Sequence, residues 1–390
     1  MTSKDKKKLV YINYMEPLPS NSERPWRGHI FCDILSESYD VTYFTSSFDH
    51  FKKKPRKKVQ WNKDYNLDFV KTIQYKHNSS PLRILSFLIF SFNSYSKIKK
   101  IKPKVIIASY PQSFSLIGLL IYKKFNEVNL IIDVRDSIFK KVGSLALHKK
   151  IIWYIYYFIE WICSLIWVRN KKFIGLGEHT YKYISDYFLF PKSSIQMEKY
   201  NYVPMPYKRL NVLNGNKNHK TFVFIGSITN SFDFSFIEEV LSDKENKLHI
   251  IGDDRNNILS KYHKYSNLFL HGYLSEKQSE RILNKSIIGV LPYINNGGFN
   301  YHITNKLPEY LSFGLSLMVP EHCLEMAKLI KDNHIGFTYN NKNTKKKINK
   351  FLKSYKNNAY AANSIEAYQR LFNISNIKIK LFDSINSAEK

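Results

Sequence analysis

The stretch FNYHITNKLPEYLSFGLSLMVP, residues 299–320, predicts a loop, a short helix and a buried strand in that order. Pro308 is compatible with the first turn of a helix, where the N–H it lacks would have no intrahelical partner, so the helix can begin near Asn305. Gly314 can adopt the left-handed conformation that ends a helix. The apolar run LSLMVP then forms the strand.

The start of this helix combines groups that suit a nucleotide-sugar. Lys306 and Glu309 are three residues apart and share a face beside Asn305, at the positive end of the helix. A cation and free backbone N–H groups would bind the diphosphate, and the carboxylate would accept from ribose hydroxyls. From spacing alone, an exposed ion pair on an ordinary surface helix is the simpler interpretation.

The decamer NKLPEYLSFG, residues 305–314, resembles the donor-binding helix of glycosyltransferase family 4, especially its bacterial O-antigen and capsule branch. In that branch the pattern Asn-Lys-Leu-x-Glu-Tyr-x-x-x-Gly is usual. The resemblance implies the GT-B fold, an α/β architecture in which two Rossmann-like parallel-sheet domains face each other across a cleft that holds the nucleotide. Many members carry another Glu eight positions before the helix Glu, where this chain has Tyr301.

The composition points to a two-domain protein with anionic partners. The chain has 390 residues, enough for two domains, and 60 Lys and Arg against 32 Asp and Glu give a net charge of +28. Such an excess favours nucleic acid, an anionic membrane surface or phosphorylated substrates, unless the lysines are simply spread over solvated faces. Three distant cysteines without metal-ligand spacing, and a start without an apolar signal core, predict a cytoplasmic protein.

Continuous apolar strands predict parallel sheets. Residues 8–14, 104–110 and 129–134 each contain a continuous apolar run (LVYI, VIIA and LII) rather than an alternating pattern, which is typical of strands covered on both faces. We expect three parts: an acceptor domain over residues 1–205, a nucleotide-sugar domain over 206–360, and over 361–390 a C-terminal helix that returns to the first domain, followed by a tail.

Sites in such sheets lie beyond the carboxyl ends of the strands, which places DVRDS, residues 133–137, at the cleft. The resemblance implies that Asp136 activates the acceptor or positions the sugar, and that Arg135 orients charge or binds phosphate. An internal Arg and Asp ion pair is the alternative. Arg27 follows a loop that is glycine-rich in the family, and it is expected to contact the acceptor unless it is an ordinary surface arginine.

In the second domain, several turns resemble the family's phosphate and base contacts. Gly226 and Ser227 look like the phosphate-side turn, and Gly252 and Asp253 lie where the nucleotide base is expected. Gly298 can bring backbone N–H groups close to a phosphate or sugar.

Residues 227–237 lack the cationic pair that much of the family carries there. Neutralisation of the phosphates would therefore fall to Lys306, to helix starts, and to His302 or Arg255. A metal at the adjacent Asp253 and Asp254 is disfavoured, since such enzymes usually neutralise phosphate with protein groups and two acids also make an ordinary turn.

Two segments suggest a membrane. Residues 151–168, IIWYIYYFIEWICSLIWV, would form a helix of about 27 Å, near the minimum for a bilayer span. Glu160 in its middle and scattered aromatics argue instead for a helix that dips into the interface or is wholly buried. The basic run KKKPRKK, residues 52–58, is expected on the surface, where it would contact lipid head groups, a pyrophosphate or nucleic acid, or only solvent.

Together these observations predict a retaining glycosyltransferase without a cofactor or essential metal. It would move a sugar from a nucleotide-sugar to a lipid-linked or core saccharide, in surface polysaccharide or lipopolysaccharide synthesis. We expect a peripheral protein on the inner face of the cell membrane, with no nucleic-acid partner. The alternatives are a non-catalytic basic protein that binds acidic glycan or nucleic acid, and a sugar-nucleotide epimerase.

Overall fold

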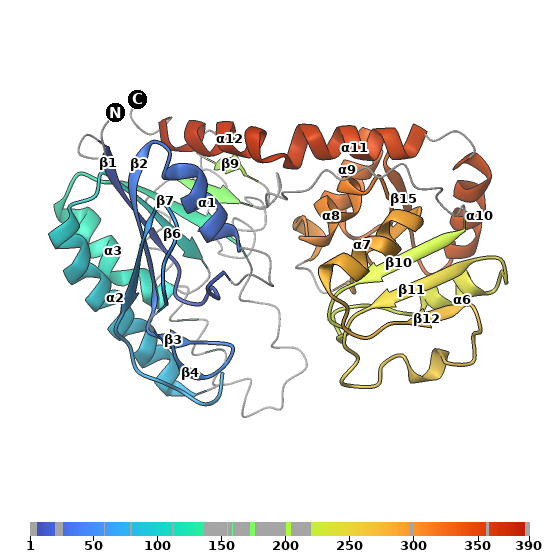
Figure 1. Cartoon of the computed structure of the whole chain (residues 1–390), viewed down its shortest axis with the longest axis horizontal. Coiled ribbons are helices and arrows are strands. Elements are labelled where there is room, and N and C mark those ends of the chain that lie inside the picture. Colours follow the sequence, from blue (N-terminus) through green and yellow to red (C-terminus); the bar gives the residue numbers. More distant parts are fainter. Residues whose placement is uncertain are drawn as a thin grey trace. The chain divides into compact units, whose positions relative to one another are not determined.

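The chain divides into two compact units, each with its own parallel sheet (Figure 1). Unit 1 comprises Met1–Leu176, Thr180–Val203 and Lys378–Lys390, and unit 2 comprises Gly177–His179 and Pro204–Ile377. The computed structural model describes residues 6–19, 26–57, 59–78, 80–110, 113–135, 154, 158, 172–175, 200–203, 220–295, 299–355 and 359–386.

Unit 1 is built on a seven-stranded sheet whose neighbouring strands all pair in parallel. In spatial order its strands are β5 (Asn66–Val70), β2 (Tyr39–Ser46), β1 (Lys7–Ile12), β6 (Val105–Tyr110), β7 (Asn129–Val134), β8 (Phe173–Gly175) and β9 (Tyr200–Tyr202). Its described helices include α1 (Arg27–Leu35), α2 (Pro81–Ile101) and α3 (Ser113–Phe125), and β3 (Phe48–Asp49) pairs with β4 (Lys54–Pro55) as a hairpin.

Local signals set the limits of α2. The hydroxyl of Ser80 accepts from the backbone N–H of Leu82 and Pro81 occupies the first turn, while Lys102 closes the helix at a φ of 53°. Helices α2 and α3 lie side by side over one face of the sheet (Figure 1). They approach closely at Gly118, where an added Cβ would lie 2.4 Å from the carbonyl oxygen of Ser91.

Unit 2 has a six-stranded parallel sheet. Its strands in spatial order are β12 (Leu268–Leu270), β11 (Lys247–Ile251), β10 (Thr221–Ile225), β13 (Ile288–Val290), β14 (Ser316–Pro320) and β15 (Gly336–Tyr339). Its helices include α6 (Phe236–Leu241), α7 (Glu276–Lys285), α8 (Lys306–Ser312), α9 (Leu324–Asn333), α10 (Thr344–Ser354) and α11 (Ala359–Phe372), with short 3₁₀ turns η4 (Ser260–Tyr262) and η5 (Phe299–Tyr301). The expected helix and strand of residues 305–320 are therefore α8 and β14.

The C-terminal segment differs from expectation. We expected the helix over residues 361–373 to pack on the first domain, but α11 packs on α8 and α9 within unit 2. The residues expected to form a tail instead form helix α12 (Ile374–Asn386), whose part from Lys378 onward belongs to unit 1. The reason is a second apolar stripe: Ile377, Leu381 and Ile385 recur every four residues and are fully buried.

The membrane-related segments are described only in part. Of residues 151–168 the structure describes only Tyr154 and Phe158, which are both exposed, so the expectation for this segment lies outside the described residues. Among the described residues, no helix is long and apolar enough to cross a membrane. In the basic run 52–58 most described side chains are exposed as expected, but Arg56 turns inward and donates to the carbonyl oxygen of Glu16 at 2.8 Å.

Candidate functional site

Two glycine turns meet at the carboxyl ends of β10 and β11. The strands pair in register up to Ile225 and Ile251, so Gly226 and Gly252 follow at the same edge. Their φ angles of +139° and +158° suit glycine rather than residues with side chains. A Cβ on Gly252 would lie 1.9 Å from the Gly226 carbonyl oxygen, so the two backbones can approach only without side chains. Ser227, next along the chain, is exposed.

The side chain of Lys306 lies over the first of these turns. A Cβ on Gly226 would come within 2.4 Å of Lys306 Cε and 2.8 Å of its Nζ, so the glycine makes room for the lysine. The ammonium lies 4.9 Å from the ring centre of Phe232, 5.7 Å from Phe224 and 5.8 Å from Tyr293. We call these three rings the aromatic cage. No carboxylate among the described residues forms an ion pair with Lys306.

The cage explains the electrostatics of Lys306. Burial lowers the pKa of Lys306 to about 8, and the Glu309 carboxylate acts in the opposite direction. The ring faces attract the ammonium, but they cannot neutralise it as a carboxylate would. The lysine is thus a poorly solvated cation that would be stabilised by an anion, at the edge of the sheet where the two glycine turns lie.

Helix α8 is held firmly beneath the sheet, which fixes the position of Lys306. The hydroxyl of Tyr310 accepts a hydrogen bond of 2.9 Å from the backbone N–H of Ile225. Its ring occupies the space left by Gly289, where a Cβ would lie 2.3 Å from the ring. Asn305 caps the helix with an exposed side chain that makes no capping bond, and Glu309 is buried with 4 % exposure.

The other predicted donor residues are placed as follows. His302 is buried, and Gly298 lies outside the described residues. The Asp253 carboxylate pairs with Arg255, and both side chains are well exposed. Asp254 accepts from the backbone N–H groups of Ile258 and Leu259 at 2.9 and 2.8 Å, which makes it a turn former. The structure thus brings together Lys306, Gly226 and Gly252.

In unit 1 the predicted arginines lie in a buried charge network. Arg27, the first residue of α1, donates from Nε to both oxygens of Asp133 at 3.1 Å and from Nη2 at 2.9 Å. Their side chains are 3 % and 0 % exposed. Arg135 donates to the same carboxylate at 3.0 Å, to the hydroxyl of Tyr11 at 2.6 Å, and to Glu16.

Glu16 completes the buried charge network, which we define as Arg27, Arg135, Asp133 and Glu16. Besides Arg135, Glu16 accepts from the backbone N–H of Gly28 at 3.1 Å and the hydroxyl of Tyr43 at 2.6 Å. Burial alone would raise the pKa of both carboxyl groups, but Arg135 holds the pKa of Glu16 below its usual value, and Arg27 and Arg135 together do the same for Asp133. Two cations and two anions therefore balance inside unit 1.

Arg27 and Arg135, for which the sequence predicts roles at the acceptor and at the sugar, both form ion pairs within unit 1. Arg27, expected to contact the acceptor, is committed to Asp133 and almost fully buried. Arg135 forms ion pairs of the kind considered as the alternative, and it keeps 15 % exposure. Asp136, the predicted catalytic residue, lies outside the described residues. The roles of these residues stay predictions.

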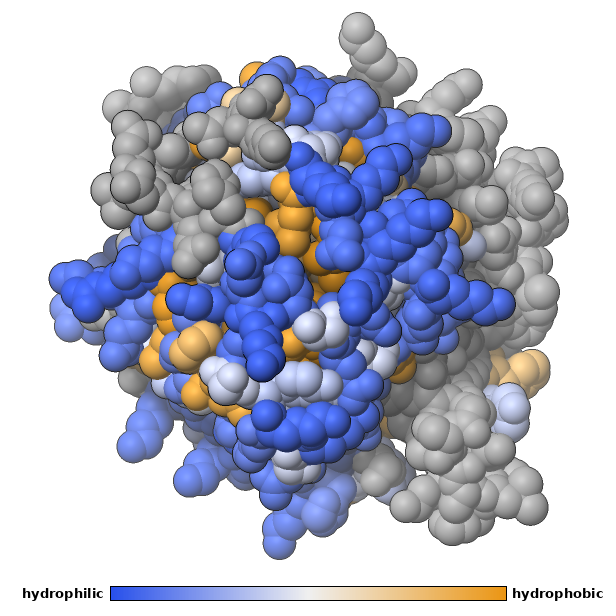
Figure 2. All heavy atoms as spheres, turned by 90° about the vertical axis from the view of Figure 1, so that its right-hand side faces the viewer, coloured by the Kyte–Doolittle hydropathy of each residue, from blue (hydrophilic) through white to orange (hydrophobic). Residues whose placement is uncertain are grey.

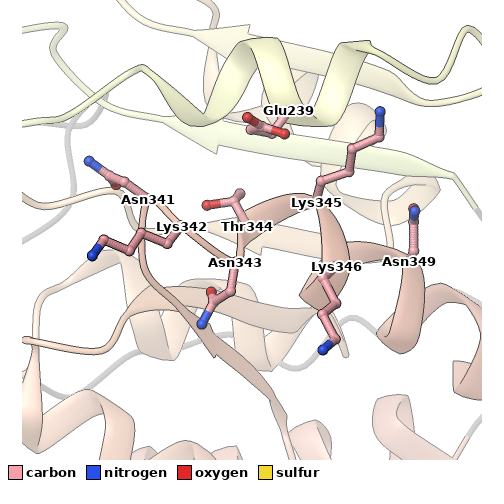
Figure 3. Close-up of a pocket in the computed structure, with 8 residues that line it drawn as sticks. All are labelled: Glu239, Asn341, Lys342, Asn343, Thr344, Lys345, Lys346 and Asn349. Atoms are coloured by element: carbon pink, nitrogen blue, oxygen red, sulfur yellow. The ribbon is translucent and has the colours of Figure 1, made fainter.

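A separate pocket of about 380 Å³ lies at the start of α10 (Figure 3). It is lined by Glu239, Asn341, Lys342, Asn343, Thr344, Lys345, Lys346 and Asn349. Figure 3 shows the lysine side chains spreading apart rather than converging on one point. This side of unit 2, at the right of Figure 1, presents mostly hydrophilic residues around a small apolar area (Figure 2). None of the predicted donor residues lines this pocket.

Comparison with known proteins defines the fold class. No protein-family model and no curated protein sequence matches the chain. Solved structures do match over nearly the whole length of both chains. Sucrose-phosphate synthase from Thermosynechococcus elongatus has a TM-score of 0.70 at 10 % identity, covering 98 % of this chain and 99 % of that one.

Two further matches are glycosyltransferases or nucleotide complexes. HepE of Anabaena, solved in complex with UDP-glucose, has a TM-score of 0.62 at 9 % identity and covers 98 % and 100 % of the two chains. The lipopolysaccharide outer core galactosyltransferase WaaB has a TM-score of 0.63 at 11 % identity and covers 97 % and 99 %. The chain therefore has a GT-B-like fold, as the sequence predicted.

Proposed function

We propose that this protein is a glycosyltransferase that uses a nucleotide-sugar donor, with Lys306 binding the diphosphate. The observation that carries the proposal is the position of this lysine, held in the aromatic cage over Gly226 without a carboxylate partner among the described residues. The GT-B-like fold and its likeness to a UDP-glucose complex support it. An ammonium in such surroundings gains most from an anion that arrives with its own charge.

In this proposal catalysis is positioning and electrostatic stabilisation of the leaving group. Lys306 neutralises charge that develops on the departing diphosphate. Glu309 would hold the ribose hydroxyls. Asp136 and Arg135 would act at the transferred sugar, and no cofactor or essential metal is required.

The acceptor and setting follow from the family resemblance and from charge. We infer a lipid-linked or core saccharide acceptor, transfer with retention, and work at the inner face of the cell membrane in surface polysaccharide or lipopolysaccharide synthesis. The net charge of +28 supports an anionic surface as partner.

Thermal stabilisation by UDP, GDP, CMP and dTDP sugars tests the donor site. We expect one base to raise the melting temperature of the wild type, and Lys306→Ala to lose this shift and turnover while remaining folded. Lys285→Ala, which removes an exposed lysine at the end of α7, is the matched control and should keep the shift. An unimpaired Lys306→Ala variant would refute the proposal.

The net charge also favours one other function, a non-catalytic basic scaffold that binds nucleic acid. It predicts steeply salt-dependent binding to duplex DNA with no stabilisation by any nucleotide-sugar. Measuring both on the same preparation separates the two.

A further inference from the structure

Helix α2 is apolar on two opposite faces. One face is buried within unit 1, through Ser86, Phe87, Phe90, Ser91, Ser94 and Ile98. The opposite face carries Leu82, Leu85 and Phe92, whose side chains are 48 %, 46 % and 52 % exposed. With the partly buried Ile89 between them, these residues recur at intervals of three and four, so they lie in one row. We call this row the outer face of α2.

The outer face is too apolar for an ordinary solvated helix. From Leu82 to Phe92 it extends about 15 Å. Single exposed leucines are common, but neighbouring large apolar side chains along one row indicate a binding surface. Half the area of each side chain remains available for a partner to cover.

The same face becomes basic at its end. Lys99 and Lys100 occupy the last turn of α2 and are exposed. Helix α3, beside α2 in Figure 1, ends with Lys124 and Phe125, and the phenylalanine is 72 % exposed. The rings of Tyr95 and Tyr122 are 6.4 Å apart and join the two helices near these ends. Neither helix contains an acidic residue.

We propose that the outer face of α2, together with the last turn of α3, docks this protein on an anionic lipid bilayer. Leu82, Leu85 and Phe92 enter the boundary between head groups and acyl chains, and the lysines contact lipid phosphates. Helices that lie in the membrane–water interface typically combine leucine and phenylalanine with lysine, as α2 and α3 do. Each lysine near the surface adds to the attraction for anionic lipid.

Charge distinguishes the bilayer from a second copy of the chain. Two copies paired through this face would bring lysine against lysine with no carboxylate on either helix to offset them. An anionic bilayer complements both the apolar row and the lysines. This docking rests on the proposed function, because it would bring a glycosyltransferase to its lipid-linked acceptor.

Co-sedimentation with vesicles tests the docking surface. The wild type should bind vesicles of phosphatidylcholine with about 30 % phosphatidylglycerol, more weakly as salt rises, and should bind pure phosphatidylcholine poorly. The double variant Leu85→Glu/Phe92→Glu should bind at least tenfold more weakly. Its matched control is Leu270→Glu/Tyr273→Glu, which makes the same kind of change at exposed residues of unit 2 and should bind as the wild type does.

A second variant and a second measurement separate docking from loss of the donor site and from self-association. Lys99→Gln/Lys100→Gln keeps the apolar row and should weaken binding severalfold while reducing its dependence on salt. Thermal stabilisation by the nucleotide-sugar should survive in every variant, so failure of docking and failure of the donor site are separable. Absence of wild-type binding, or equal binding by the α2 variant and its control, overturns the proposal. A variant-dependent change in oligomeric state without vesicle binding would assign the face to a second copy.

Discussion

The buried charge network of unit 1 and the aromatic cage of unit 2 surround their cations in opposite ways. In unit 1, Arg27 and Arg135 share Asp133, and Glu16 supplies a second carboxylate. In unit 2, Lys306 has aromatic rings around it and no ion pair among the described residues. A buried cation with its own carboxylates serves the fold, whereas one surrounded by rings retains an attraction for an incoming anion.

All three cations come from segments that resemble the same family, but only Lys306 is placed to meet a ligand without first breaking an ion pair of its own. If the contrast holds, substitutions of Asp133 will act mainly on stability, and substitutions at the cage will act mainly on donor binding.

The largest effect is expected from Asp133→Ala, which leaves two buried guanidinium groups with one carboxylate. Removing one partner from a buried ion pair costs about 3–5 kcal/mol of unfolding free energy. Asp68→Ala is the control, since Asp68 pairs with Lys97 where both side chains are about one-third exposed, and about 1 kcal/mol or less is expected. Urea unfolding measures both. Similar losses for the two variants would show that the network stabilises the fold no more than an exposed ion pair does.

Donor binding should depend on pH through Lys306. In the protein without a donor, Lys306 has a pKa of about 8. A bound diphosphate would raise this pKa, so Lys306 takes up a proton when the donor binds above pH 8. Affinity should then be flat below about pH 7 and fall by up to tenfold per pH unit above 8. Titration calorimetry in buffers of different ionisation enthalpy detects the proton. Lys306→Arg should abolish the dependence, and a persistent dependence would point to another group.

A smaller effect is expected from Phe232→Leu, which removes the ring nearest the ammonium. Loss of one cation–π contact is worth about 0.5–1 kcal/mol, or a two- to fivefold weaker donor affinity. Phe234→Leu provides the control, because the ring of Phe234 packs against Phe232 but is not among the rings around Lys306. Equal effects of the two would show that the rings matter only as packing.

The smallest effect is expected on the stability of Lys306→Met. Methionine fills similar space without a charge to desolvate, so the unfolding free energy should change by less than about 1 kcal/mol, or rise. A thermal melt at pH 7 without nucleotide measures it. A large loss would mean that Lys306 is a structural residue like Asp133, and the contrast between the two regions would disappear.

The fold could be predicted because its signals are local. Continuous apolar strands, and Gly314 after α8, each act within a few residues, and the structure confirms these elements. The glycines after β10 and β11 could likewise be found, since each follows its own strand. Helix α12 was not predicted, because the apolar stripe that begins at Ile377 has only three members.

The partners in the candidate site could not be predicted, because they join residues far apart in sequence. Arg27 and Asp133 are 106 positions apart, and only the strand order brings them together. Phe232 and Tyr293 meet through an isolated bridge between two loops. One signal was available: a single aspartate inside the apolar strand NLIIDV must find a partner, and Asp133 finds two.

Helix α12 has a consequence for how the protein is made. Lys378–Lys390 belong to unit 1, yet the ribosome produces them only after Pro204–Ile377, which fold as unit 2. Until then, Tyr39 cannot stack on the ring of Phe382, and the side-chain amide of Asn129 cannot donate to the carbonyl oxygen of Ile385. At about 5–20 residues per second, the delay is on the order of ten seconds or more. During that interval the nascent chain exposes an apolar surface that a chaperone could bind, and the first unit to begin folding is the last to finish.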